Sequence, residues 1–112
     1  MEDNFCPINA ALDLLQEKWN LHIIRALLRA PHGFNELARA VGGVNAATLS
    51  ARLEKLEKRG LIERTVESVM PPRTRYELTR AGQELHGVID LVSAWALRHP
   101  EAVQDDAPLE SA

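Results

Sequence analysis

The sequence predicts a mainly helical α+β chain, with four helices, then a two-stranded β-hairpin, then one long last helix. Three observations lead to this prediction. Apolar residues recur every three to four positions through most of the chain, which is the spacing of one helix face. Between residues 61 and 78 they are mostly β-branched or alternate with polar residues, as in strands. Glycine, asparagine or threonine stands at most of the expected boundaries, where these residues cap or end helices.

The N-terminal third of the chain predicts two helices. Pro7 marks the first turn of the first helix, with Cys6 as its cap, because proline is favoured at the first helical position. A second helical stretch occupies residues 19–28 and is broken by Pro31 and Gly33. The apolar stripe of the first helix includes Ile8, Leu12 and Leu15.

A short helix, a glycine turn and a longer helix are predicted next. Phe34 is expected in a short extended piece, and Asn35 is expected to cap the short helix. After two glycines, Asn45 can cap the longer helix, which ends at Gly60. The buried stripe of this helix is expected to be Leu49, Leu53 and Leu56.

Residues 61–67 and 74–78 are predicted to form the hairpin, with Tyr76 and Leu78 on one face. The segment 68–73 contains two prolines, which should prevent either strand from continuing, so a projecting loop is expected there.

Thr79 is expected to cap the long last helix. Its apolar stripe consists of Leu85, Val88, Ile89, Val92 and Trp95.

The chain length of 112 residues suits one domain, which we assign to residues 1–100. Residues 101–112 form an acidic tail that is expected to be disordered. The net charge of −3 hides a split, because residues 18–80 carry twelve Lys and Arg against six Asp and Glu. Both flanking segments are acidic. A basic middle suggests a nucleic-acid surface, although a mixed solvated surface would give the same count.

Three features of the chain favour a cytoplasmic protein with no membrane contact. The N-terminus is acidic, unlike the basic start of a signal peptide. A single cysteine cannot form a disulfide within the chain. No apolar run approaches the ~20 residues that cross a bilayer.

The predicted order of elements is that of a winged helix-turn-helix, so we predict a fold of this type in which the first and last helices are additions. Such a fold places one helix in the major groove of duplex DNA. The fourth helix suits that role, because one side is leucine-rich and the other presents small or polar residues. The candidate DNA-binding residues on and before it are Asn45, Thr48, Ser50, Ala51, Arg52 and Lys55. A plain surface helix is the alternative interpretation.

The hairpin, or wing, carries Arg73 and Arg75 beside its two prolines. Arginine on a projecting loop can enter the minor groove or hold flanking phosphates. The alternative is an ordinary solvated loop.

The apolar stripes of the first and last helices exceed what one small domain needs for its own core, so a homodimer is predicted. Its interface is expected to contain Ile8, Leu12, Leu15, Leu85, Ile89, Val92 and Trp95. Two copies of the fourth helix, about 34 Å apart, would match a pseudo-palindromic operator.

The chain resembles the HxlR-type family of bacterial winged-helix regulators over about residues 6–97, nearly the whole ordered part. The matching segments are Cys6-Pro7, residues 14–19 (LLQEKW), 21–28 (LHIIRALL), 34–37 (FNEL), 48–62 (TLSARLEKLEKRGLI), 71–73 (PPR), Tyr76 and 78–82 (LTRAG).

The resemblance implies a homodimer formed by the first and last helices, and operator binding as a repressor or an activator. It also implies a role for Cys6, because some members sense oxidants or electrophiles at this position. Four positions depart from the family pattern. Gln16-Glu17 stands where the family often has Gly-Gly, Ala47 where a polar or basic residue is common, and Arg75 where an acid is common.

Cys6 is a candidate redox-sensing residue on its own chemistry as well. A helix N-terminus favours the reactive thiolate, whereas a buried cysteine would be inert. The effector implied is an oxidant or another small molecule, and no cofactor is expected. The four histidines show no metal-ligand spacing, and no hydrolase or phosphate-loop motif is present, so neither a metal site nor an enzyme is predicted. A winged helix used only for protein–protein contact is the alternative function.

Overall fold

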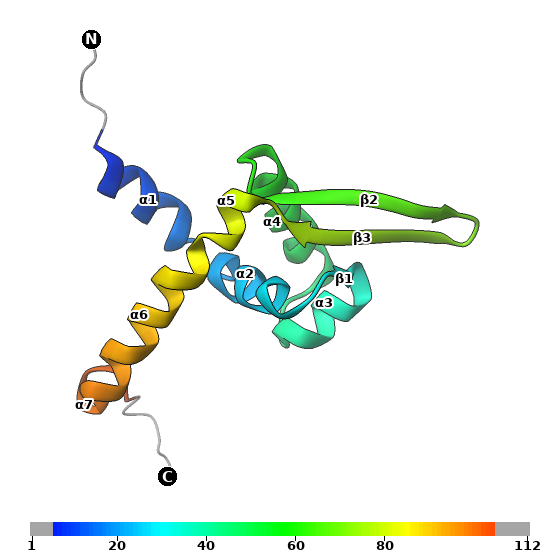
Figure 1. Cartoon of the computed structure of the whole chain (residues 1–112). Helices are drawn as coiled ribbons and strands as arrows, with labels where there is room; N and C mark the ends of the chain where they lie inside the picture. Colours follow the sequence, from blue (N-terminus) through cyan, green and yellow to red (C-terminus); the bar gives the residue numbers. More distant parts are fainter. Residues whose placement is uncertain (1–5, 105–112) are drawn as a thin grey trace.

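The computed structural model describes residues 6–104, whose backbone forms a small sheet surrounded by helices, with two helical arms that extend from it (Figure 1). The elements follow one another as α1 (Pro7–Leu15), α2 (Asn20–Arg29), β1 (His32–Gly33), α3 (Phe34–Val41), α4 (Ala46–Lys58), β2 (Ile62–Val69), β3 (Pro72–Leu78), α5 (Arg80–Gln83), α6 (Leu85–Arg98) and α7 (Pro100–Val103). This arrangement is the winged helix-turn-helix that the sequence predicts, with additional helices at both ends.

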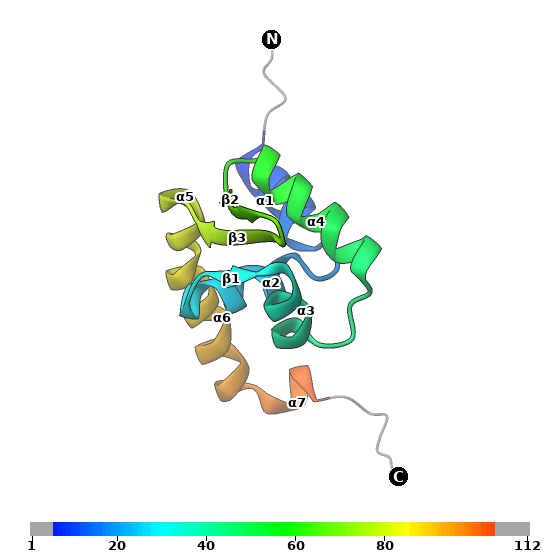
Figure 2. The same cartoon turned by 90° about the vertical axis from the view of Figure 1, so that its right-hand side faces the viewer.

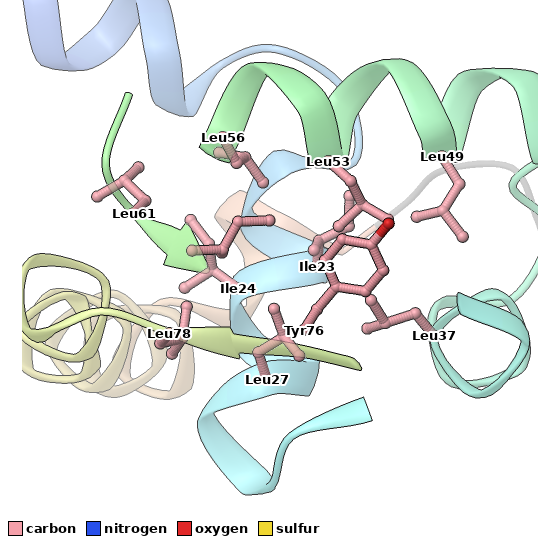
Figure 3. Packing of buried hydrophobic residues seen from close by; sticks show 11 residues of the cluster. Ile23, Ile24, Leu27, Leu37, Leu49, Leu53, Leu56, Leu61, Tyr76 and Leu78 are labelled. Carbon is pink, nitrogen blue, oxygen red and sulfur yellow. The ribbon is translucent and has the colours of Figure 1, made fainter. Parts of the chain in front are cut away.

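The hydrophobic core lies between α4, α2 and the inner face of the sheet (Figure 3). The predicted stripe of α4 is confirmed, since Leu49, Leu53 and Leu56 are all buried. Tyr76 and Leu78 of β3 face the same core, as their alternation predicts. The remaining core residues are Ile23, Ile24, Leu27, Leu37, Leu61 and Ile62.

The sheet has three antiparallel strands in the order β1-β3-β2. The very short β1 pairs only with Tyr76 and Arg75 of β3, which anchors the base of the hairpin to the segment that leads into α3. Beyond this pairing, β2 and β3 continue together and project from the body as the wing (Figure 1).

The wing differs from the predicted loop over residues 68–73. Val69 pairs with Pro72, so both strands continue almost to the tip and only Met70 and Pro71 form the turn. Pro72 is tolerated there because it stands at the first position of its strand. A register irregularity between Val66 and Ser68 lets the strands remain paired on either side of it.

The start of α3 also differs from the prediction. Phe34 is the first residue of the helix, not part of an extended piece, and the cap is Gly33 rather than Asn35. The reason is a hydrogen bond in which the Gly33 N–H donates to Glu36 Oε1 at 2.8 Å. That same backbone donor is the main cause that lowers the pKa of Glu36 below its usual value.

The last helix is divided. Thr79 caps a short α5 as predicted, with its hydroxyl accepting from the Gly82 N–H and donating to the Gly60 carbonyl at 2.6 Å. Glu84 then separates α5 from α6. Gly82 is buried against the Leu61 carbonyl and the Leu78 side chain, so this short helix packs tightly against the start of the wing.

The two ends of the described chain are helical. Pro100–Val103 forms α7, so the beginning of the segment expected to be disordered is ordered, and residues 105–112 lie outside the described residues. The first five residues also lie outside them. No helix within residues 6–104 has both the length and the apolar character to cross a bilayer.

A pair of glycines tests the packing of α5. We predict that Gly82→Ala lowers the free energy of unfolding by about 1–3 kcal/mol, because the new methyl group would overlap the Leu61 carbonyl and the Leu78 side chain. Gly87→Ala in α6 is the matched control, since a Cβ there meets no atom within 4 Å. It should raise stability by about 0.5–1 kcal/mol. Urea unfolding measures both, and equal effects would contradict the tight packing of α5.

Candidate nucleic-acid interface

The helix-turn-helix consists of α3, a glycine turn and α4. Gly42 and Gly43 have φ angles of 71° and 84°, a left-handed backbone conformation that residues other than glycine rarely adopt. Asn45 then caps α4 as predicted, because its Oδ1 accepts from the Thr48 N–H at 2.8 Å. The turn and the cap together fix where α4 begins.

The first two turns of α4 present small and uncharged side chains to solvent. Ser50 and Ala51 are exposed, together with Ala46 and Ala47, while Thr48 is half-buried. This side is free because the leucine stripe occupies the opposite one. A helix face of this kind can approach base edges closely and offers the Ser50 hydroxyl for hydrogen bonding.

Two predicted DNA contacts on α4 lie in a different environment. Arg52 Nε donates to the Lys18 carbonyl at 2.9 Å, and its Nη1 lies 3.6 Å from Glu17 Oε2. Lys55 Nζ lies 3.1 Å from Glu17 Oε1. The hydrogen bond from Lys55 is the main cause that lowers the pKa of Glu17. Arg52 and Lys55 are therefore both held by the segment between α1 and α2.

That segment has an unusual backbone. Trp19 has a φ of 82°, the left-handed region that costs energy for a residue with a side chain. The adjacent Asn20 is fully buried, and its Nδ2 donates to the Leu14 carbonyl at 2.8 Å and to Glu17 at 3.3 Å. Lys18 Nζ lies 5.1 Å from the centre of the Trp19 ring. These contacts hold Glu17 in place beside α4.

A groove separates α4 from the base of the wing. Its lining residues are Ser50, Glu54, Glu57, Lys58, Arg64 and Tyr76. Arg64 pairs with Glu57 across it at 3.8 Å. Burial raises the pKa of the Tyr76 phenol, which forms the floor of the groove. The C-terminal half of α4 is therefore charged with both signs, whereas its N-terminal half is uncharged.

The two arginines of the wing stand on strand β3, not on a loop. Arg75 Nη1 lies 3.6 Å from Glu67 Oε2, so its charge is partly balanced by the neighbouring strand. Arg73 is exposed near the tip, and no ion pair joins it to any residue between 6 and 104. Of the two, Arg73 is the one that no ion pair with another described residue neutralises.

The helical arms carry apolar side chains that the core does not cover. Neither α1 nor α6 has a fully buried residue. Leu85 and Ile89 pack partly on the core, and Leu15 is half-buried. The exposed apolar residues of the arms are Ile8, Leu12, Val88, Leu91, Val92, Trp95 and Leu97. Figure 2 shows α6 running away from the sheet along one side of the molecule.

Cys6 is the cap of α1, as its place before Pro7 predicts. Its side chain is half-buried, and its carbonyl accepts from the Ala10 N–H at 3.0 Å. Within the described residues, no group of three His, Cys, Asp or Glu side chains is placed to hold a metal ion.

Sequence reasoning missed Glu17 and Asn20. Asn20 looks like any polar residue near a helix start, and nothing in its spacing reveals full burial. Glu17 did leave a signal, because an acid stands where the resembled family often has glycine. The residue at this departure, Glu17, forms an ion pair with Arg52 of α4, which lies 35 positions later in the sequence.

Comparison with known proteins gives concordant results. The model of the HxlR-like helix-turn-helix family matches residues 14–104. The regulator sll1512 of Synechocystis, an HTH-type transcriptional regulator by name, is 37% identical over 86 residues, which cover 77% of this chain and 64% of that protein. YodB of Bacillus subtilis, also named an HTH-type transcriptional regulator, is 33% identical over 97 residues, which cover 86% of this chain and 87% of YodB.

The fold agrees with that of solved regulators. The crystal structure of quinone-bound YodB from B. subtilis superimposes with a TM-score of 0.74 at 32% identity, covering 84% of this chain and 99% of that one. YodB has also been solved in a reduced form and after diamide treatment. The matched relatives are transcriptional regulators by name and not enzymes.

Proposed function

This chain belongs to the HxlR-like helix-turn-helix family of transcriptional regulators, and we propose that it is a cytoplasmic homodimer that binds duplex operator DNA in a sequence-specific manner. In this proposal α4 enters the major groove as the recognition helix. Arg73 and Arg75 of the wing contact the minor groove or the flanking phosphates.

The observation that carries the proposal is the two-sided character of α4. One side is fully used by the core, and the first turns of the other side are small, uncharged and exposed. Asn45 caps α4 at this end. The N-terminus of a helix carries a partial positive charge, which favours the binding of phosphate. Asn45, Thr48, Ser50 and Ala51 are thus proposed to lie at the DNA, with Arg52 and Lys55 at its edge.

A winged helix that only binds another protein is the competing function. Such a module does not need cations at the tip of its wing. Arg73 is exposed near the tip of the wing, away from the body of the protein. A cation in this position is suited to contact the phosphate backbone of DNA. The proposal therefore favours DNA.

Arg73 tests the proposal. We predict that Arg73→Ala weakens binding to the DNA upstream of the protein's own gene. The loss should be about 1–3 kcal/mol for a base contact, or a salt slope lower by about one unit for a phosphate contact. A gel shift or anisotropy titration over a range of salt concentrations measures this.

Arg80→Ala is the matched control, because Arg80 is a surface arginine on α5, at the far end of the wing from Arg73, and pairs with Glu84 at 3.7 Å. Its DNA affinity should stay that of the wild type. If Arg73→Ala binds as tightly as Arg80→Ala, the wing does not contact DNA. If the wild type binds no duplex, the whole proposal is wrong.

The homodimer is proposed to form through the exposed apolar faces of α1 and α6. Leu91 is 73% exposed and Val92 is 58% exposed, and they lie on α6, a helix that has no buried residue. A contiguous apolar face of this kind is typical of an interface. The residues proposed at this interface are Ile8, Leu12, Leu15, Leu85, Ile89, Val92 and Trp95.

We predict that the wild type is a dimer at micromolar concentration and that Val92→Glu is a monomer, because a buried unpaired carboxylate would oppose association. Light scattering after size-exclusion chromatography measures the mass. Val69→Glu is the control, since Val69 is equally apolar and 79% exposed but ends β2, whose outer end lies far from α6 (Figure 1). A monomeric wild type, or a dimeric Val92→Glu, would contradict this interface.

We further propose that Cys6 makes DNA affinity responsive to an oxidant or electrophile. Cys6 is the only thiol of the chain, stands at a helix N-terminus that favours thiolate, and belongs to the arm proposed to form the dimer. A modified Cys6 would shift α1 against α6 and change the spacing of the two recognition helices. The relative YodB, whose structures include a quinone-bound form, supports this hypothesis.

We predict that mild peroxide or a quinone changes the operator affinity of the wild type and leaves that of Cys6→Ser unchanged. A sulfenic acid at Cys6 has no second cysteine in its own chain, so a disulfide would form with the other subunit or with a small thiol. Anisotropy before and after treatment measures the response. Equal responses of the two proteins would assign the switch elsewhere, and no response of the wild type would remove it.

A further inference from the structure

We propose that Glu17 acts as an internal competitor of DNA phosphate. It occupies Arg52 and Lys55 of α4 and thereby lowers the sequence-independent affinity of the protein for DNA. This inference rests on the proposed function, since it concerns the same helix. The competitor is a residue of the segment between α1 and α2, not of the helix-turn-helix itself.

The geometry places one carboxylate between two cations. Glu17 Oε1 lies 3.1 Å from Lys55 Nζ, and Glu17 Oε2 lies 3.6 Å from Arg52 Nη1. Each oxygen thus faces its own cation, the arrangement that a phosphate with two free oxygens would adopt. Arg52 and Lys55 are separated by three positions on α4, so both project toward the same side of that helix.

The carboxylate is held in place by contacts that do not depend on DNA. Asn20 donates to Glu17 Oε1 at 3.3 Å, and that asparagine is itself anchored to the Leu14 carbonyl at 2.8 Å. The Arg52 guanidinium is also fixed through Nε, which donates to the Lys18 carbonyl at 2.9 Å. Glu17 is therefore a positioned group rather than a surface acid that moves away freely.

The cations concerned border the proposed DNA surface. Lys55 follows Ala51 by four positions, so it lies just over one helical turn, about 6 Å, beyond the uncharged face of α4. Its side chain is 45% exposed, so an external phosphate can reach it. A phosphate in contact with Lys55 would lie within roughly 6 Å of the Glu17 carboxylate, which is less than the ~8 Å over which physiological salt screens charge.

Glu17 could instead support DNA binding by orienting Arg52 and Lys55. The two roles predict opposite signs. A competitor, when neutralised, releases cations to the DNA and tightens binding. An orienting group, when neutralised, loosens both cations and weakens binding. The sign of one measured change therefore separates the two roles.

The experiment uses Glu17→Gln, which keeps the shape of the side chain and its hydrogen bond with Asn20 while removing the charge. Binding to a mixed-sequence duplex of about 30 base pairs, roughly three helical turns, is measured by anisotropy across a salt series. We expect Glu17→Gln to bind about three- to tenfold more tightly at low salt. Its salt dependence should be steeper by up to about one unit for each cation released.

Two further variants make the result specific. Glu84→Gln removes one negative charge from a surface acid at the start of α6, paired with Arg80 at 3.7 Å, and should leave DNA affinity unchanged. In a Lys55→Gln background the gain from Glu17→Gln should shrink, because one of the two cations is already absent. Thermal melts of all variants establish that each is folded.

Several results would overturn the inference. Weaker binding by a folded Glu17→Gln would assign Glu17 an orienting role. If Glu84→Gln raised DNA affinity as much as Glu17→Gln, the effect would come from the change in net charge and not from the position of Glu17. An unchanged affinity would show that Arg52 and Lys55 do not meet phosphate, while wild-type binding would still support the proposed function. If the wild type binds no duplex, both proposals fall together.

Discussion

The burial of one leucine stripe determines most of what this protein presents to its surroundings. Leu49, Leu53 and Leu56 lie on one side of α4 and are covered by the sheet and α2. Burying such side chains contributes about 1.5–3 kcal/mol each, so α4 cannot rotate about its axis without a large loss. The orientation of the opposite side follows directly. Its small and polar residues face outward because the leucines must face inward.

The wing depends on the same core through β3. Tyr76 and Leu78 face α4 from the sheet, while the exposed alternate positions of that strand carry Arg73 and Arg75. The short β1 adds hydrogen bonds at the base of the wing and at the same time leads into α3. The helix-turn-helix and the wing thus both pack on one core, which keeps their relative positions fixed.

The arms differ from this unit in their energetics. They have helical backbones and apolar side chains but no fully buried residue of their own. Within one chain they are held by backbone hydrogen bonds and by a few core contacts, of Leu14 in α1 and of Leu85 and Ile89 in α6. A second copy would supply the missing burial. The segment that links α1 to α2 contacts α4 through Glu17. A movement of α1 would therefore be passed to the helix that is proposed to bind DNA.

Local patterns in the sequence determined much of this fold. The bounds of α4, its cap at Asn45, its buried leucines and the glycine that follows it all depend on interactions within a few residues, so they could be predicted. The family and the class of regulator were also readable, because an ordered set of segments carries them. The candidate DNA residues remain a prediction derived from the outward side of that helix.

The tertiary structure decided what depends on contacts distant in sequence. The segment 68–73 is paired strand except for the turn at Met70 and Pro71, because cross-strand pairing extends to Val69 and Pro72. The cap of α3 is Gly33 rather than Asn35, at the point where β1 ends against β3 and the Gly33 N–H donates to Glu36. Arg52 and Lys55 look like free cations in the sequence, yet both meet Glu17, more than thirty positions away. Sequence periodicity reports which side of a helix is apolar, but only folding brings a distant carboxylate to its polar side.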